Sequence, residues 1–124
     1  CGRKGCLETF VSGPGITRDH FSRTQATLSA TELEVHAGEG DKQAELTLSL
    51  FEDRLARGLA VVVNLLDPDV IVFGGGVSKM NRIYKNLPPL LSKNAFYQGK
   101  LRTKLVPALH GDSSGVRGAA WLWA

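Results

Sequence analysis

Two cysteines and a glutamate at the start of the sequence are the first residues that could do chemistry. Cys1 and Cys6 flank the tetrapeptide Gly-Arg-Lys-Gly. Thiolates bind Zn²⁺, and Gly2 and Gly5 can adopt positive φ, which lets a tight loop wrap an ion. Two thiolates do not complete a four-ligand site, so a zinc site would need partners outside this chain. A disulfide is the alternative, although nothing in the sequence suggests a secreted protein.

Glu8 follows Cys6 by two residues, in the first turn of a short helix expected over Leu7–Val11. The run Ser12-Gly13-Pro14-Gly15 is expected to close this helix. A carboxylate at a helix start interacts favourably with the helix dipole, which would be a structural role. The same carboxylate, held in place by a metal knuckle before it, would also accept hydrogen bonds from two adjacent hydroxyls, as on a sugar.

Gly74, Gly75 and Gly76 follow an apolar strand expected over Val70–Phe73 and precede a helix. Open α/β sheets bind ligands at this edge, and the missing Cβ atoms let a phosphate or a flat ligand approach the backbone. The run fits neither the dinucleotide-binding nor the P-loop pattern. A purely structural turn remains the alternative.

His110, Asp112 and Ser113 have the residue types of a hydrolase triad. They are nearly consecutive, whereas triad members converge from separate elements, so we reject that interpretation. Asp112 and Ser113 are expected to cap the last helix instead. His20 and His36 lie in a polar region and are expected to be solvated rather than to bind a ligand.

The clearest element is a long helix predicted over Lys42–Leu66. Its apolar residues recur at the three-to-four spacing of one helix face: Leu48, Phe51, Leu55, Leu59, Val62 and Leu66. Its C-terminal half is apolar on nearly every side and should be deeply packed. The continuous apolar run of Val70–Phe73 predicts a strand covered on both faces of a sheet.

The remaining elements are less distinct. Ile16–Asp41 is polar, with a helix-start signal at Ser29–Glu32. Further along, the sequence predicts a helix over Lys79–Leu91 interrupted by Pro88-Pro89, a strand over Leu101–Val106, and a closely packed last helix over Val116–Trp123 that contains Trp121. Alternating helices and strands indicate an α/β domain.

Composition narrows the class of protein. The 124 residues, 43% of them hydrophobic, suffice for one core, and no apolar run approaches the length of a membrane span. A net charge of +3 does not predict a nucleic-acid partner. The basic cluster Lys100, Arg102 and Lys104 is expected to be a solvated face, with a phosphate-binding patch as the alternative. The sequence begins with Cys1 and not with Met, which predicts a fragment of a longer protein.

Four segments together resemble the ROK family of sugar kinases and related repressors. They occur in the family's order: Cys1–Glu8, Thr9–Gly15, Pro68–Ser78 and His110–Trp123. The first is similar to the second half of the family's cysteine-rich signature, and the third to its nucleotide-side strand and turn. The last is especially similar to the C-terminus of the bacterial mannofructokinase branch.

The resemblance implies a zinc-dependent kinase that transfers the γ-phosphoryl group of ATP, with Mg²⁺, to a hexose, with fructose as the expected acceptor. Cys1 and Cys6 match the last two of the family's four zinc ligands, one His and three Cys. Glu8 matches the carboxylate that binds sugar hydroxyls, and Gly74–Gly76 match the turn against the nucleotide.

The implied fold is the actin-like ATPase (ribonuclease H-like) α/β fold, with residues 1–124 forming much of its C-terminal domain. The N-terminal domain, the first phosphate loop and the general-base Asp would lie upstream, so this chain would hold no catalytic residue and be inactive alone. The full-length protein is expected in the cytoplasm, and a homodimer is one of the assemblies that it is expected to form. The alternatives are a sugar-sensing repressor with an upstream helix-turn-helix, and a kinase for glucose, mannose or N-acetylglucosamine.

Overall fold

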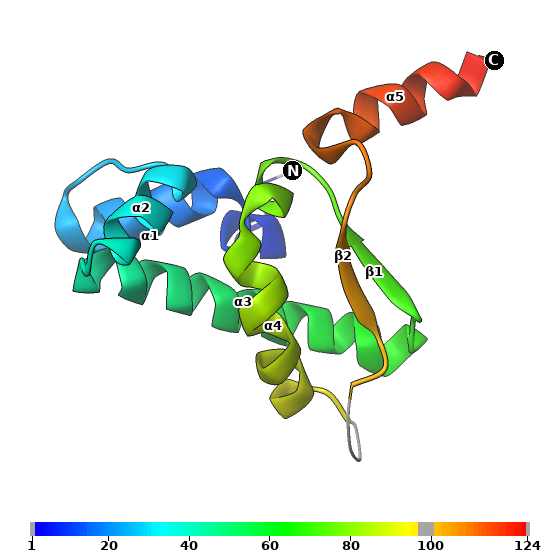
Figure 1. The fold of residues 1–124 in the computed structure, drawn as a ribbon, viewed down its shortest axis with the longest axis horizontal. Coiled ribbons are helices and arrows are strands. Elements are labelled where there is room, and N and C mark those ends of the chain that lie inside the picture. The colour runs from blue at the N-terminus through cyan, green and yellow to red at the C-terminus, as the bar shows by residue number, and fades with distance from the viewer. Residues whose placement is uncertain (1, 97–100, 124) are drawn as a thin grey trace.

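A single long helix organises the domain. The computed structural model describes residues 2–96 and 101–123. In it α3 (Lys42–Leu66) runs the length of the helical body (Figure 1). Asp41 caps its first turn, since the carboxylate accepts from the backbone N–H groups of Gln43 and Ala44. The chain leaves the helix at Asp67, whose φ of 41° is left-handed, just before Pro68. The long helix predicted from periodicity is confirmed.

Three further helices pack on α3 and enclose the core. They are α1 (Gly13–Thr24), α2 (Ala30–Gly38) and α4 (Asn81–Asn94). The largest side chains buried among them are Ile16, Leu33, Leu48, Phe51, Ile83 and Leu87. The apolar stripe of α3 therefore meets helices on more than one side, which explains its strong periodicity.

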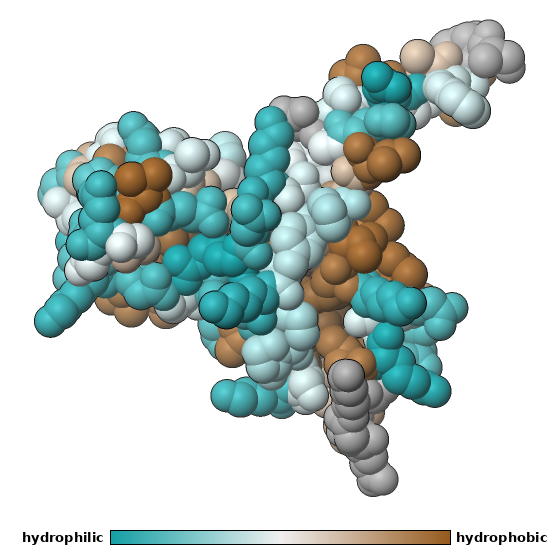
Figure 2. Space-filling model, in the orientation of Figure 1, coloured by the Kyte–Doolittle hydropathy of each residue, from teal (hydrophilic) through white to brown (hydrophobic). Residues whose placement is uncertain are grey.

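The sheet has two parallel strands in the described residues. β1 (Val70–Phe73) pairs with β2 (Lys104–Pro107), with Val70 opposite Lys104. Apolar surface gathers over the strands in Figure 2, and Val72 is 59% exposed. The expectation of a strand covered on both faces is therefore wrong for the described residues, although its apolar run predicted the strand itself correctly.

The C-terminal half of α3 is less buried than its composition predicts. Ala60 and Val63 are buried, whereas Leu65 and Leu66 are 77% and 73% exposed. A helix that is apolar on every side tends to be covered on every side. Its sequence does not identify the segments that cover it. In the described residues α4 and the sheet cover one side only.

Two expectations about where helices end or break are wrong. Ser12–Gly15 was expected to close a helix, but it begins α1: the Ser12 hydroxyl accepts from the Gly15 N–H, and Pro14 occupies the first turn. α4 continues through Pro88 and Pro89 without interruption, because Leu87 and Leu91 on either side of them are fully buried against the core. Here tertiary packing outweighs the cost of proline inside a helix.

The C-terminal segment lies away from the body. After the one-turn helix η3 (Gly111–Ser113), α5 (Ser114–Ala120) and η4 (Trp121–Trp123) project outward (Figure 1). Trp121 is 80% exposed, so the expected close packing of this helix is not observed. The Ser113 hydroxyl donates to the His110 carbonyl at 2.8 Å and does not cap α5. The side chains of Asp112 and Trp123 lie outside what the structure describes.

His20 is buried rather than solvated, which corrects the expectation for this residue. It is 2% exposed, and its Nδ1 lies 2.8 Å from the Thr47 hydroxyl. That hydroxyl donates its single proton to the Gln43 carbonyl, so it accepts from His20 and from Arg23, and Nδ1 is the protonated ring nitrogen. Burial lowers the pKa of His20, and the nearby Arg23 guanidinium lowers it further.

The buried His20 makes stability depend on pH. Because its folded-state pKa lies below its unfolded value of about 6.5, its contribution is complete above that pH and is lost as the pH falls below it. The loss is expected to reach at most about 1.4 kcal/mol per pH unit. Urea unfolding of the full-length protein at several pH values measures it. His20→Gln should flatten this dependence, whereas the half-buried His36 provides His36→Gln as the control; equal dependence in both variants contradicts the assignment.

Candidate functional site

A cleft of about 950 Å³ opens where four segments meet. They are the one-turn helix η1 (Leu7–Thr9), the starts of α1 and α2, and the turn after β1. Its lining residues include Glu8, Ser12, Gly13, Arg18, Ser29, Thr31, Leu55, Phe73, Gly74, Gly75 and Gly76. The cleft thus brings together Glu8 and the glycine turn, which are far apart in the sequence.

Glu8 occupies the middle of η1. The turn is closed by hydrogen bonds from the Thr9 N–H to the Cys6 carbonyl and from the Phe10 N–H to the Leu7 carbonyl, both 3.0 Å. The expected short helix is therefore present but tighter than an α-helix. The Glu8 side chain is exposed and lines the cleft, so its oxygens can accept hydrogen bonds from hydroxyls of a ligand.

The starts of α1 and α2 both face the cleft. At α2, the Ser29 hydroxyl accepts from the Glu32 N–H while the Glu32 carboxylate accepts from the Ser29 N–H at 2.7 Å. The hydrogen bonds from Ser29 also lower the pKa of Glu32. Helix N-termini favour negative charge, so two of them at one cleft suit an anionic ligand such as a phosphate chain.

Only one of these two helix starts was recognised in the sequence. The capping box at Ser29–Glu32 was identified as a helix start, although not its place at the cleft. The start of α1 at Gly13 was missed, because two glycines read as a terminator. The usable signal was Ser12 followed two residues later by Pro14, which is typical of a capped first turn.

The glycine turn leaves open space beside the sheet. Gly75 has a φ of 70°, a conformation that favours glycine, and a Cβ at Gly74, Gly75 or Gly76 would meet no atom within 4 Å. The turn continues into the one-turn helix η2 (Gly76–Lys79). It is tied down by the Ser78 hydroxyl, which donates to the Gly75 carbonyl, and by the Tyr84 hydroxyl, which donates to the Ser78 carbonyl, both at 2.7 Å. A ligand can therefore approach a turn that is already ordered.

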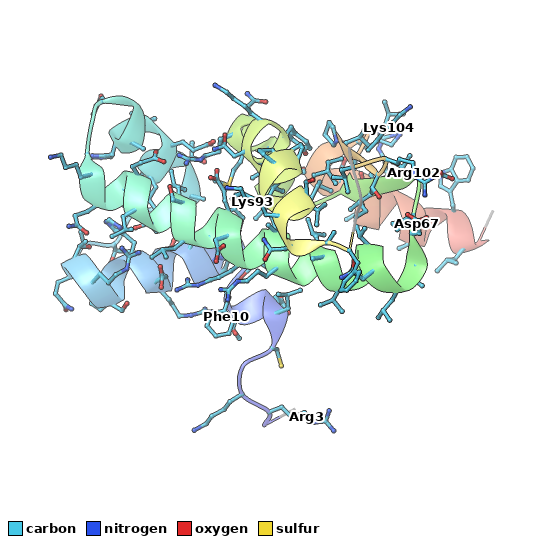
Figure 3. The ribbon with its side chains drawn as sticks, turned by 90° about the horizontal axis from the view of Figure 1, so that it is seen from below. Arg3, Phe10, Asp67, Lys93, Arg102 and Lys104 are labelled. Atoms are coloured by element: carbon cyan, nitrogen blue, oxygen red, sulfur yellow. The ribbon has the colours of Figure 1, made fainter. Side chains whose placement is uncertain are left out.

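The structure describes one of the two cysteines of the expected metal site. Cys1 lies outside the described residues, and Cys6 has an exposed free thiol. Gly2 and Gly5 have φ values of 75° and 78°, as expected for a tight loop. Figure 3 shows the segment that carries Arg3 extending away from the body. Within residues 2–96 and 101–123 no three His, Cys, Asp or Glu residues form a metal-binding group, so zinc remains a prediction.

The two described residues of the basic cluster, Arg102 and Lys104, do not line the cleft. Lys100 lies outside the described residues, and Arg102 and Lys104 are exposed. Arg102 forms an ion pair of 3.2 Å with Asp67 at the end of α3 (Figure 3). This arrangement agrees with a solvated face.

In the part of the chain that the structure describes, no helix has the length and apolarity needed to cross a membrane.

Several comparisons with known proteins point to the same family. The family model described as the ROK family matches residues 1–124. An N-acetyl-D-glucosamine kinase of Yersinia pseudotuberculosis is 38% identical over 122 residues, which cover 98% of this chain and 40% of that protein. The chain therefore spans about two fifths of the length of the curated relatives it matches.

Solved structures agree with this result. The ROK hexokinase of Thermus thermophilus superposes with a TM-score of 0.79 at 31% identity, covering 97% of this chain and 41% of that chain. A ROK family transcriptional regulator, a homologue of the E. coli MLC protein, gives a TM-score of 0.69 at 25% identity over 86% of this chain and 30% of that chain. The predicted actin-like ATPase type of α/β fold is confirmed.

Proposed function

The chain belongs to the ROK family, and from this we propose that the polypeptide carrying these residues is an ATP-dependent hexose kinase. The observation that carries the proposal is the shared cleft: Glu8 and Gly74–Gly76 line one cavity. A kinase must hold its acceptor and its nucleotide side by side. We propose that residues 1–124 form much of its C-terminal domain.

We assign the two ends of the cleft to the two substrates. Glu8 accepts hydrogen bonds from two neighbouring hydroxyls of the hexose. The open turn Gly74–Gly76 receives the nucleotide, and the starts of α1 and α2 stabilise phosphate charge. Phosphoryl transfer depends on positioning and electrostatic stabilisation, to which Mg²⁺ bound with ATP contributes. The general-base Asp is expected from the rest of the polypeptide.

Zinc is part of the proposal as a structural ion. Cys1 and Cys6 would supply two thiolates, and the remaining ligands would come from upstream residues. The positive φ of Gly2 and Gly5 fits a loop that wraps around an ion. Such a site directly precedes η1, so its chemistry would be to fix the segment from which Glu8 projects.

The acceptor sugar is the finer part of the proposal. The similarity of His110–Trp123 to the mannofructokinase branch favours fructose. The relatives named as N-acetyl-D-glucosamine kinases favour N-acetylglucosamine instead. Glu8 does not discriminate between them, because adjacent hydroxyls occur in both sugars. We also propose that the enzyme is cytoplasmic and that it can form a homodimer.

A second candidate is a sugar-sensing transcriptional repressor. The similarity to the ROK family transcriptional regulator favours it, because that protein shares the fold of this chain. The same cleft would then bind sugar as a signal, and an additional helix-turn-helix would bind DNA. This candidate requires no turnover of ATP.

The deciding experiment is a phosphorylation assay of the purified full-length protein with ATP and Mg²⁺. We expect turnover of fructose or N-acetylglucosamine, with glucose and mannose as comparison sugars, and no turnover by residues 1–124 alone. Sugar phosphorylation by the isolated 124 residues would contradict the proposed division of the site. Sugar binding without turnover, together with specific DNA binding, would establish the repressor instead.

A further inference from the structure

The helix that carries Glu8 does not hold itself in place. η1 is one turn long and has no buried residue. Short isolated helical turns are unstable in water, because one or two hydrogen bonds do not offset the ordering of the backbone. The position of Glu8 therefore depends on what η1 contacts.

One contact surface is α1. The Arg18 guanidinium donates to the Thr9 carbonyl at 3.1 Å. Gly15 lies so close to η1 that an added Cβ would be 2.7 Å from the same carbonyl oxygen. Backbone thus approaches backbone, and the residue directly after Glu8 is fixed from this side.

The other contact surface is the middle of α3. The Arg54 guanidinium lies over the Phe10 ring at 5.7 Å from its centroid, and it forms an ion pair of 3.1 Å with Asp19. Leu7 packs on Gly58, where an added Cβ would be 2.8 Å and 3.0 Å from the two Leu7 methyl carbons. Figure 3 shows Phe10 lying against this side of α3.

The ion pair that holds Arg54 is itself well supported. The Asp19 carboxylate also accepts from Arg23 at 2.7 Å. Partial burial acts to raise the pKa of Asp19, but the hydrogen bonds from Arg23 and Arg54 outweigh it, so the pKa lies below its usual value. Asp19 is ionised at neutral pH, and Arg54 is held over the ring.

We propose that Arg54 and Gly58 are positioning residues that set the place of Glu8 and thereby the affinity for the hexose. The inference rests on the proposed function of Glu8. Arg54 acts through Phe10 and Gly58 acts through Leu7, so the two contacts fix η1 on either side of Glu8. Neither residue touches the sugar.

Gly58→Ala separates positioning from structural support. Alanine in place of glycine inside a helix favours the helix, so the urea midpoint of the full-length protein should stay the same or rise. The new methyl group must displace the Leu7 side chain, whose terminal carbons it meets, and we expect η1 to shift because this side chain is its contact with α3. We expect the KM for the hexose to rise about threefold to tenfold, with the KM for ATP unchanged. The control is Gly38→Ala in α2, where an added Cβ meets nothing within 4 Å.

Arg54→Leu tests the second contact. It removes the cation over Phe10 and the ion pair with Asp19, and the KM for the hexose should again rise about threefold to tenfold. Arg54→Lys retains the charge and should recover part of the loss. The control is Asp53→Asn, which breaks an exposed ion pair with Arg57 on the same helix.

Hydrogen exchange gives a readout that does not need activity. In both Gly58→Ala and Arg54→Leu, the amides of Phe10 and Val11, which close η1 on the Leu7 carbonyl, should exchange faster. If the full-length protein phosphorylates a hexose and both variants keep its KM and this exchange, the inference is overturned. If no hexose is phosphorylated, the proposed function fails, and unchanged exchange alone then overturns the positioning roles.

Discussion

Replacing Arg82 by methionine is expected to lower the free energy of unfolding by about 3–5 kcal/mol. The Arg82 Nε lies 2.5 Å from the Glu52 carboxylate, whose side chain is 4% exposed. Arg82 also forms two hydrogen bonds with Glu45, of 2.9 Å and 3.1 Å. Among the described residues, methionine leaves the buried Glu52 with the Asn86 amide as its remaining hydrogen-bond partner, at 3.0 Å and 3.1 Å. An uncompensated buried charge is far more costly than a missing surface pair.

Urea unfolding of the full-length protein measures this effect, with Arg57→Met as the matched control. Arg57 pairs with Asp53 on the surface of α3, where both side chains are about half exposed or more, so its loss should cost at most about 1 kcal/mol. Adding Glu52→Leu to Arg82→Met should recover most of the stability, because it removes the unpaired charge. A loss below about 1 kcal/mol in Arg82→Met would show that Glu52 is not held by this pair.

This pair also shows what sequence reasoning can and cannot find. Periodicity predicted a long helix near Lys42–Leu66, where α3 lies, because much of its core face and the Asp41 cap are encoded locally. Glu52 is followed by the charged residues Asp53 and Arg54 in the sequence of the same helix, so its neighbours do not predict that it is buried. Its burial depends on Arg82 in α4, which is thirty positions away. A charged residue becomes a core residue only when a distant partner compensates it, and spacing along one helix does not report that.

The candidate site was also predictable only in part, because its residues are brought together by tertiary packing. Glu8 and Gly74–Gly76 were identified separately from residue type and from their place before a helix or after a strand. That they line one cleft is a property of how α1 and α2 pack on α3. His20 was misjudged for a related reason: its sequence neighbours are polar, but Thr47 and the packing of α1 on α3 bury it.

Two apolar residues show the opposite error, because they were expected to be buried and are exposed. Val72 and Leu66 belong to patterns typical of buried elements, yet both are exposed in the described residues. Hydrophobic patterning records that a face tends to be covered, and a parallel sheet normally has both faces covered.

Glu8→Gln is expected to lower kcat/KM for the hexose about 10- to 100-fold, because hydrogen bonds to a charged acceptor contribute about 1.5–3 kcal/mol. Glutamine has the same shape but lacks the charge, and Glu8 is exposed, so stability should not change. Steady-state kinetics of the full-length protein measure the effect. Glu39→Gln, an exposed change at the end of α2, is the control. A kcat/KM within about twofold of the unaltered protein would contradict the assignment of Glu8.

Combining Glu8→Gln with Gly58→Ala then tests whether the two residues act through one interaction. Gly58 contacts Leu7 and not the cleft, so its effect on the hexose should pass through the Glu8 carboxylate. Once that carboxylate is absent, Gly58→Ala should add less than about twofold, and the two effects should not be additive. Full additivity would mean that Gly58 influences the sugar by another route. Non-additivity together with an unchanged urea midpoint would identify α3 as the support that makes the Glu8 carboxylate an effective ligand for the sugar.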